Sequence, residues 1–179
     1  MKRLTLLRHA KSTWDDPVAR DFDRPLNRRG RKAARRIGEE MRALGLSFDA
    51  AIASPAVRVK ETLAEVEQGF GRDLRVTFEQ AVYLASPETL LDLIRAADDG
   101  AASLLLVGHN PGLESLAVDL TSGGPLRAQA AIKYPTATLA ELSFDCPTWR
   151  EIAPGRGRLD RFIRPRDLDP ELGPDEDSD

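Results

Sequence analysis

The two histidines of this 179-residue chain each follow a short apolar segment. His9 comes after residues 3–7, with Arg8 between, and His109 comes after residues 103–107. Short apolar segments that stop at polar residues are typical of buried strands. A guanidinium offers a planar fork of donors that matches phosphate oxygens, and an imidazole nitrogen can attack phosphorus. These residue types together predict chemistry on a phosphoryl group.

Arg58 extends the set, because it lies one turn into a helix that we expect to follow Ser54-Pro55. Ser54 itself ends another strand candidate, residues 49–53. Arg8 and Arg58 would hold the phosphoryl group and neutralise its oxygens, one histidine would attack phosphorus, and the other would bond the transferring oxygens. We expect no metal or other cofactor, since the segments lack the carboxylates that a hard cation prefers.

Helical and strand patterns alternate along the chain. We expect helices from Asn27, as N-cap, to about Leu44, from Pro55 to about Glu67, from Ser86 onward, and over residues 112–120. Further strands are expected at 74–78 and, as a closing antiparallel pair, at 137–144 and 149–153. The predicted fold class is a three-layer α/β/α sandwich with a mostly parallel central sheet and no large cap insertion. Ligands of such sheets bind beyond the carboxyl ends of the strands, which is where the histidines and arginines fall.

Charge divides the chain into an expected domain, residues 1–164, and an acidic tail, residues 165–179, which we expect to be disordered. The tail carries seven acidic residues and one arginine, so the domain holds 25 basic and 22 acidic residues, a net charge of +3. That balance suits an anionic ligand. The whole-chain charge of -3 predicts no nucleic-acid partner, and the lack of an 18-residue apolar run predicts no membrane partner. Cys146 is the single cysteine, which favours an inert thiol in the cytoplasm.

Four segments, in this order, resemble the motifs of the histidine phosphatase superfamily, which has the phosphoglycerate-mutase-like fold. They are Thr5-Leu6-Leu7-Arg8-His9-Ala10-Lys11-Ser12, Arg24-Pro25-Leu26-Asn27-Arg28-Arg29-Gly30, Ser54-Pro55-Ala56-Val57-Arg58-Val59-Lys60-Glu61-Thr62 and Val107-Gly108-His109-Asn110-Pro111. Ala10 stands where the family usually has glycine, as is common in its SixA-like phosphohistidine phosphatase branch. The resemblance implies that His9 is phosphorylated and that Arg8, Arg58 and His109 complete the phosphate pocket.

The proton donor is the open position. Many phosphatases of this superfamily use an acidic residue between the Arg58 segment and the second histidine, and Glu79 is the nearest by position. A surface carboxylate without a catalytic role is the alternative reading of Glu79. Asp15 lies near the place of a phosphate-binding asparagine in some members, but a carboxylate would repel phosphate. A phosphoramidate substrate needs less from a donor, because its leaving nitrogen can be protonated beforehand.

The short stretch between Arg58 and His109 leaves no room for an enclosing cap, so we expect an open pocket. The leading hypothesis is a SixA-like phosphatase that acts on phosphohistidine or other protein-borne phosphate. The alternatives are a phosphomonoesterase for small phosphorylated molecules and an inactive module that binds phosphorylated partners. A phosphoglycerate mutase is disfavoured, since it would need a closed pocket.

Overall fold

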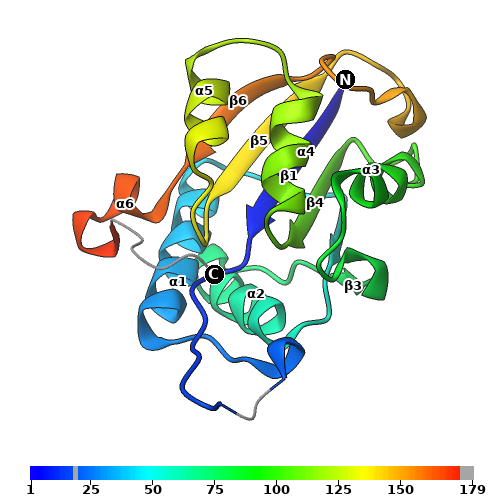
Figure 1. Cartoon of the computed structure of the whole chain (residues 1–179). Coiled ribbons are helices and arrows are strands. Elements are labelled where there is room, and N and C mark those ends of the chain that lie inside the picture. The colour runs from blue at the N-terminus through cyan, green and yellow to red at the C-terminus, as the bar shows by residue number, and fades with distance from the viewer. Residues whose placement is uncertain (18–19, 174–179) are drawn as a thin grey trace.

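The computed structural model describes residues 1–17 and 20–173, and its centre is one six-stranded sheet of order β3-β2-β4-β1-β5-β6. Strands β1 to β4 are parallel, whereas β5 is antiparallel to both β1 and β6. The strands are β1 (Lys2–Arg8), β2 (Ala50–Ala53), β3 (Thr77–Phe78), β4 (Ser103–Gly108), β5 (Leu139–Phe144) and β6 (Arg158–Ile163). The expected α/β class with a mostly parallel sheet is confirmed (Figure 1).

Helices cover both faces of the sheet, as the three-layer prediction requires (Figure 1). They are α1 (Arg28–Ala43), α2 (Val57–Phe70), α3 (Pro87–Arg95), α4 (Gly112–Leu120), α5 (Pro125–Ile132) and α6 (Pro165–Leu168). Short 3-10 helices are η1 (Asp21–Asp23), η2 (Gln80–Val82), η3 (Trp149–Glu151) and η4 (Pro170–Leu172). Between β3 and β4 the described chain forms only η2 and α3, in line with the expected absence of a cap.

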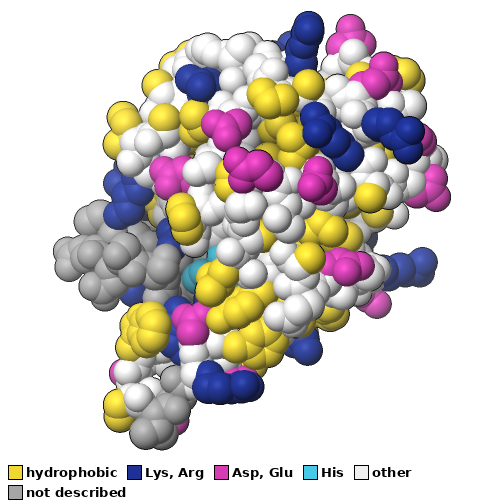
Figure 2. Space-filling view, turned by 45° about the vertical axis from the view of Figure 1, so that its right-hand side comes forward, with side chains coloured by type: hydrophobic (Ala, Val, Ile, Leu, Met, Phe, Trp, Pro, Cys, Tyr) yellow, Lys and Arg dark blue, Asp and Glu magenta, His cyan; other side chains and the backbone are white. Residues whose placement is uncertain are grey.

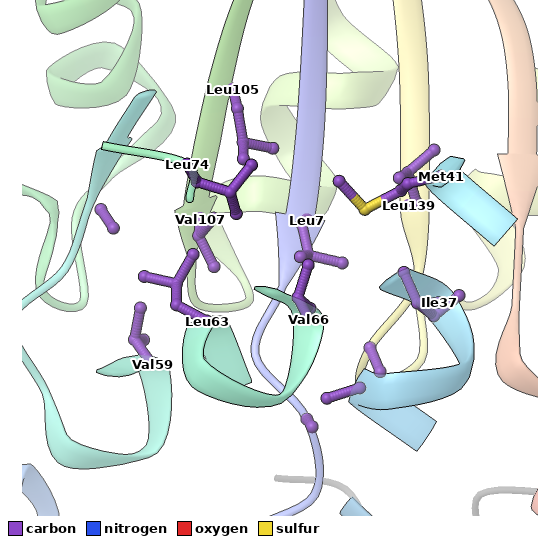
Figure 3. Close-up of a cluster of buried hydrophobic side chains, with 14 of the residues drawn as sticks. Leu7, Ile37, Met41, Val59, Leu63, Val66, Leu74, Leu105, Val107 and Leu139 are labelled. Atoms are coloured by element: carbon purple, nitrogen blue, oxygen red, sulfur yellow. The ribbon is translucent and has the colours of Figure 1, made fainter. Parts of the chain in front are cut away.

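Each face of the sheet has its own apolar core, because alternate side chains of a strand point to opposite faces. Leu7 of β1 and Val107 of β4 pack with α1 and α2, as Figure 3 shows. Leu6 and Leu106, one position earlier in each strand, pack with α3 and α4 on the other face. The ends of β1 and β4 are therefore held from both sides.

Helices α1 and α2 touch backbone to backbone at two glycines. A Cβ on Gly38 would overlap the carbonyl oxygen of Val66, and one on Gly69 would overlap that of Arg35. A third glycine, Gly30, brings the start of α1 equally close to the carbonyl oxygen of Lys11. These contacts need residues without a side chain, and they fix where α2 and its arginine stand relative to β1.

Two of the expected strands differ from the structure, one near the end of the chain and one in its middle. The closing partner of β5 is β6, whereas the predicted strand at 149–153 is wrong, since Trp149–Glu151 form η3. Trp149 is fully buried and its indole donates to the carbonyl of Ala101. The apolar side chain therefore packs in the core, and its backbone does not pair with a described strand. The expected strand at 74–78 is reduced to Thr77–Phe78, and α5 has no predicted counterpart because Ala130 is its one buried residue.

The prediction of a disordered tail from residue 165 is wrong for residues 165–173. Helix α6 and η4 fold beside α1, with Leu172 buried in the α1–α2 core. Lys32 of α1 pairs with Asp169 and Glu171, which gives these acidic residues a partner. The remaining tail, residues 174–179, lies outside the described residues.

Candidate active site

The two histidines lie side by side at the carboxyl edge of the sheet. Strands β1 and β4 pair in parallel so that Arg8 stands opposite Gly108, and the N–H of His9 donates to the carbonyl of Gly108 at 3.1 Å. The ring centroids of His9 and His109 are 5.2 Å apart, and the residues are 2% and 3% exposed. Figure 2 shows a small area of histidine at the surface, bordered by apolar side chains.

His9 has one ring nitrogen committed and the other available. Its Nδ1 lies 2.7 Å from the carbonyl oxygen of Ala10. A carbonyl only accepts, so Nδ1 carries the proton and Nε2 keeps its lone pair. Burial, followed by the charge of Arg8 and the neighbouring His109, holds the pKa of His9 well below its ordinary value. The neutral ring is the form that can attack an electrophile.

His109 is held in the opposite tautomer. Its Nδ1 is 3.3 Å from Nη2 of Arg58, and its Nε2 is 2.7 Å from Oγ of Ser54. Because a guanidinium only donates, Nδ1 accepts, and Nε2–H donates to Ser54. Burial first, and then the charge of Arg58, lowers the pKa of His109 to about 3.

Helix α2 delivers Arg58 through two residues of the same motif. Oγ of Ser54 accepts from the N–H of Ala56 at the start of the helix. Oγ1 of Thr62 donates to the carbonyl of Arg58 at 2.6 Å and accepts from the N–H of Ala10 at 2.9 Å. The threonine thus ties the helix to the residue that follows His9. Ser54 and Thr62 stood in a recognised motif, yet their roles were not predicted.

Arg8 is anchored by a segment that connects α5 to β5. Its Nη1 donates to the carbonyl of Tyr134 at 2.9 Å, and the amide of Asn110 donates to the same oxygen at 3.0 Å. The N–H of Ala137 donates to the carbonyls of Arg8 and His9. This segment joins both histidine loops, and no pattern in the sequence indicated it.

Asp21 is a site residue that the sequence analysis missed, in a loop interpreted only as polar. Its carboxylate accepts from Nη2 of Arg58 (3.1 Å), Nε of Arg24 (3.2 Å) and the hydroxyl of Tyr83 (2.5 Å). Burial opposes ionisation of this carboxyl, but Tyr83, Arg58 and Arg24 outweigh it and lower the pKa of Asp21. The ionised carboxylate of Asp21 therefore forms an ion pair with Arg58, whose guanidinium is expected to bind phosphate.

A stacked pair continues this network to the surface. The guanidinium of Arg24 is buried, with 3% of the residue exposed, and lies 3.3 Å from the ring centroid of Trp14. The indole of Trp14 is 64% exposed. Stacking of an arginine on an aromatic face is favourable and keeps the guanidinium oriented.

The structure does not bring Glu79 into contact with the histidines. Its backbone lies at the correct edge, since its N–H donates to the carbonyl of Ala53 at the end of β2. Among the described residues, no hydrogen bond or ion pair joins its half-buried carboxylate to His9, Arg58 or His109. Asp15 is exposed, in agreement with its exclusion from the pocket.

Residues 1–17 and 20–173 contain neither a candidate metal site nor a helix able to span a membrane. No three histidine, cysteine or acidic side chains lie together in a way that could hold a metal ion. In the same part of the chain, every helix is too short or too polar to cross a bilayer.

Comparison with known proteins identifies relatives over most of the chain. The family model for the histidine phosphatase superfamily (branch 1) matches residues 4–81. An uncharacterized protein of Mycobacterium tuberculosis H37Rv is 35% identical over 89% of this chain and 100% of its own length. An uncharacterized chloroplastic protein of Arabidopsis thaliana is 31% identical over 92% of this chain and 78% of its own.

Two solved structures, each named as a candidate phosphohistidine phosphatase SixA, share the fold. The structure from Agrobacterium tumefaciens is 34% identical, with a TM-score of 0.75 over 90% of this chain and 97% of that chain. The structure from Nakamurella multipartitia is 26% identical, with a TM-score of 0.79 over 92% of this chain and 96% of that chain. The expected phosphoglycerate-mutase-like, SixA-like architecture is confirmed.

Proposed function

The chain belongs to the histidine phosphatase superfamily, and on this premise we propose that it hydrolyses phosphorylated substrates through a phosphohistidine intermediate on His9. One observation carries the proposal. The bond from Nδ1 to the carbonyl of Ala10 leaves the lone pair of Nε2 available, beside the pair formed by Arg58 and His109. A site that only binds phosphate has no need of a neutral imidazole fixed in this tautomer.

In the first step, Nε2 of His9 attacks phosphorus, a P–N bond forms, and the bond to the leaving group breaks. Arg58 and Arg8 neutralise charge on the equatorial oxygens. Once the phosphoryl group lies between Arg58 and His109, the proton of His109 shifts from Nε2 to Nδ1, which donates to an oxygen, and the hydroxyl of Ser54 donates to Nε2. In the second step, water attacks phosphorus, phosphate leaves, and the electron pair returns to Nε2. The guanidiniums supply the positive charge, so we propose that the reaction needs no metal.

The leaving group must gain a proton. For phosphoesters we retain Glu79 as the proposed donor, on the position of its backbone beside β2. For a phosphoramidate no donor is needed, because the leaving nitrogen can be protonated before attack. Because the described structure gives the Glu79 carboxylate no hydrogen bond or ion pair to the histidines, a substrate that needs no donor, phosphohistidine, is favoured.

A protein-borne substrate also suits the surface around the pocket. The histidines are only 2% and 3% exposed, so a protruding phosphoryl group suits them better than a bulky one, and the described chain between β3 and β4 forms only η2 and α3. Trp14, 64% exposed, and Leu84, 55% exposed, offer apolar contact area next to the network of Asp21 and Tyr83. Exposed large apolar side chains beside a site commonly mark contact with a protein partner.

The test is turnover of a panel that includes a phosphohistidine protein, a phosphotyrosine peptide and small phosphate esters, with and without chelator. We expect the phosphohistidine protein to give the highest kcat/KM, chelator to have no effect, and acid-labile phosphate to accumulate on His9. His9→Ala should abolish turnover, and Arg58→Ala should lower it about 10²–10³-fold. Arg150→Ala, at an exposed residue of η3, is the matched control.

Each alternative has its own outcome. Near-normal turnover by His9→Ala would remove the covalent mechanism. Higher kcat/KM for small esters than for any phosphohistidine protein would assign a small-molecule phosphomonoesterase. Binding of phosphate without turnover by the wild type would assign a binding module.

A further inference from the structure

A second pocket lies beside the phosphate pocket, and its lining is rich in cations. Helix α1, the segment before β5 and helix α6 meet there, and α6 lies beside α1 in Figure 1. The cationic side chains come from separate parts of the sequence, together with the buried Thr136: Lys11, Arg29, Lys133, Arg164 and Arg166. We call this group the basic pocket.

Close backbone contacts build the basic pocket. Gly30 leaves no space between α1 and the carbonyl oxygen of Lys11, which also accepts from the N–H of Asn27 at 3.0 Å. Lys11 is thereby held next to Arg29. On the opposite wall, Gly173 packs against the side-chain stem of Arg166, where a Cβ would overlap it. Close packing of the backbone therefore holds the cationic residues in place on both walls of the basic pocket.

The acidic residues of the C-terminal segment do not neutralise Arg29 and Arg166, two of the cations that line the basic pocket. Asp167 pairs with Arg164 at 2.8 Å, while Asp169 and Glu171 are directed to Lys32 outside the pocket. Among the described residues, no ion pair joins Arg29 or Arg166 to a carboxylate. Like charges held together in a pocket repel one another, and an anionic ligand would relieve that cost.

The basic pocket shares its backbone with the phosphate pocket. Lys11 follows His9 by two residues, and Lys133 and Thr136 flank Tyr134, whose carbonyl anchors Arg8. Ala137, next to Thr136, donates to the carbonyl of His9 at 2.9 Å. Residues of the two pockets are therefore joined by short backbone connections, both after β1 and before β5.

We propose that the basic pocket is a second anion subsite, which binds a carboxylate or phosphate of the substrate next to the phosphoryl group that is removed. The role of this subsite in turnover rests on the proposed phosphatase function. It assigns a substrate class, in which a phosphorylated residue is flanked by acidic side chains or a small molecule carries two phosphates.

The experiment compares matched substrates that differ in the second anion. One pair of phosphohistidine peptides carries either two flanking aspartates or two asparagines, and one pair of alkyl phosphates carries either a second phosphate or a hydroxyl. Wild type should show a kcat/KM ratio of about 2–5 in favour of the anionic member of one pair, because one exposed ion pair contributes up to about fivefold. The pair that shows the preference identifies the source of the anion.

The double variant Arg29→Gln/Arg166→Gln should bring that ratio close to 1. Arg150→Gln/Arg156→Gln removes the same charge from exposed residues near η3, at the opposite edge of the sheet, and should keep the wild-type ratio. A wild type without preference in either pair, or a ratio that survives in the Arg29/Arg166 variant, would overturn the subsite.

Binding of the same peptides to His9→Ala protein, followed by fluorescence polarisation, separates this proposal from the proposed function. If wild type turns over nothing but the acidic peptide binds about fivefold more tightly through Arg29 and Arg166, the subsite stands and the phosphatase assignment fails. If turnover is observed and the binding preference is absent, the subsite fails and the phosphatase stands.

Discussion

The two imidazoles of the site are almost equally buried, yet their partners give them opposite tautomers. A carbonyl oxygen takes the Nδ1 proton of His9, whereas a guanidinium requires Nδ1 of His109 to accept. The lone pair that can attack phosphorus is therefore on Nε2 of His9, whereas the lone pair on Nδ1 of His109 accepts from Arg58. The difference in chemical role follows from one hydrogen bond at each ring.

Both rings stay neutral in the folded protein, which makes its stability depend on pH. The pKa of His109 is lowered to about 3, so between pH 7 and 5 the unfolded chain takes up a proton there and the folded chain does not. Stability is then lost as the pH falls below the ordinary value of 6.5. We expect His109 to cost about 2 kcal/mol over this range, and His9 to act in the same direction.

Denaturant unfolding of wild type and His109→Gln at pH 7 and pH 5 measures this effect. The wild type should lose about 2 kcal/mol more of its free energy of unfolding than the variant does, since glutamine does not titrate. Equal losses in the two proteins would mean that folded His109 titrates near its ordinary pKa.

At this scale, the sequence predicted the shared location of Arg8, His9, Arg58 and His109, while their catalytic roles stay a prediction. Their types and their places after apolar segments were sufficient for that. Asp21 could not be predicted in the same way, because nothing local distinguishes it from other acidic residues of a polar loop. Its contact with Arg58 depends on how that loop folds back over α2.

At the scale of elements, the crossing of α1 and α2 positions Arg58. The two helices meet at Gly38 and Gly69, where backbone lies against backbone. Helix propensity alone predicts that alanine would stabilise either position by about 0.5–1 kcal/mol. The close packing of the two helices predicts the opposite, namely that alanine at either position lowers the free energy of unfolding.

We expect Gly38→Ala to destabilise the protein by about 1–3 kcal/mol, because the new methyl group would force the helices apart. Arg58 would move with α2, so kcat/KM should fall as well. Gly100→Ala is the matched control, since its Cβ would meet only the flexible Asp98 side chain, at 3.3 Å. Thermal unfolding that shows Gly38→Ala as stable as wild type would contradict the close crossing.

Elements with a clear start signal were predicted well, and those defined by distant contacts were not. Asn27 accepts from the N–H of Gly30, as its predicted N-cap position requires, and Ser86 accepts from that of Thr89 where a helix was predicted to begin. Residues 149–153 had an apolar pattern typical of a strand, but the pattern reflects the burial of Trp149 against Ala101. Local sequence cannot distinguish these two uses of an apolar side chain.

At the scale of the whole molecule, the two cores meet along the sheet and the site lies at one end of that seam. The fold class followed from the alternation of patterns, because parallel strands with helical connections have few stable arrangements. At this scale the main error of the sequence analysis was the prediction of disorder for residues 165–173. Its acidic composition indicated disorder, whereas Leu172 and the pairs with Lys32 fasten residues 165–173 to α1.

Leu172→Ala should therefore lower the free energy of unfolding of the full chain by about 2–4 kcal/mol, the range for deletion of a buried leucine side chain. Ile132→Ala, at a residue that is 85% exposed, should change it by less than about 0.5 kcal/mol. Chemical denaturation of both variants checks the pair. A Leu172→Ala protein as stable as Ile132→Ala would mean that the segment does not contribute to the core.

The stacked pair of Trp14 and Arg24 gives the protein an optical reporter. The chain has two tryptophans, and Trp149 is fully buried at the opposite edge of the sheet while Trp14 is 64% exposed. A water-borne quencher would thus extinguish the emission of one indole and spare that of the other. The guanidinium of Arg24, which stacks on Trp14, also binds Asp21. If an incoming anion displaces the Asp21 carboxylate, the quenchable fluorescence of Trp14 should therefore change.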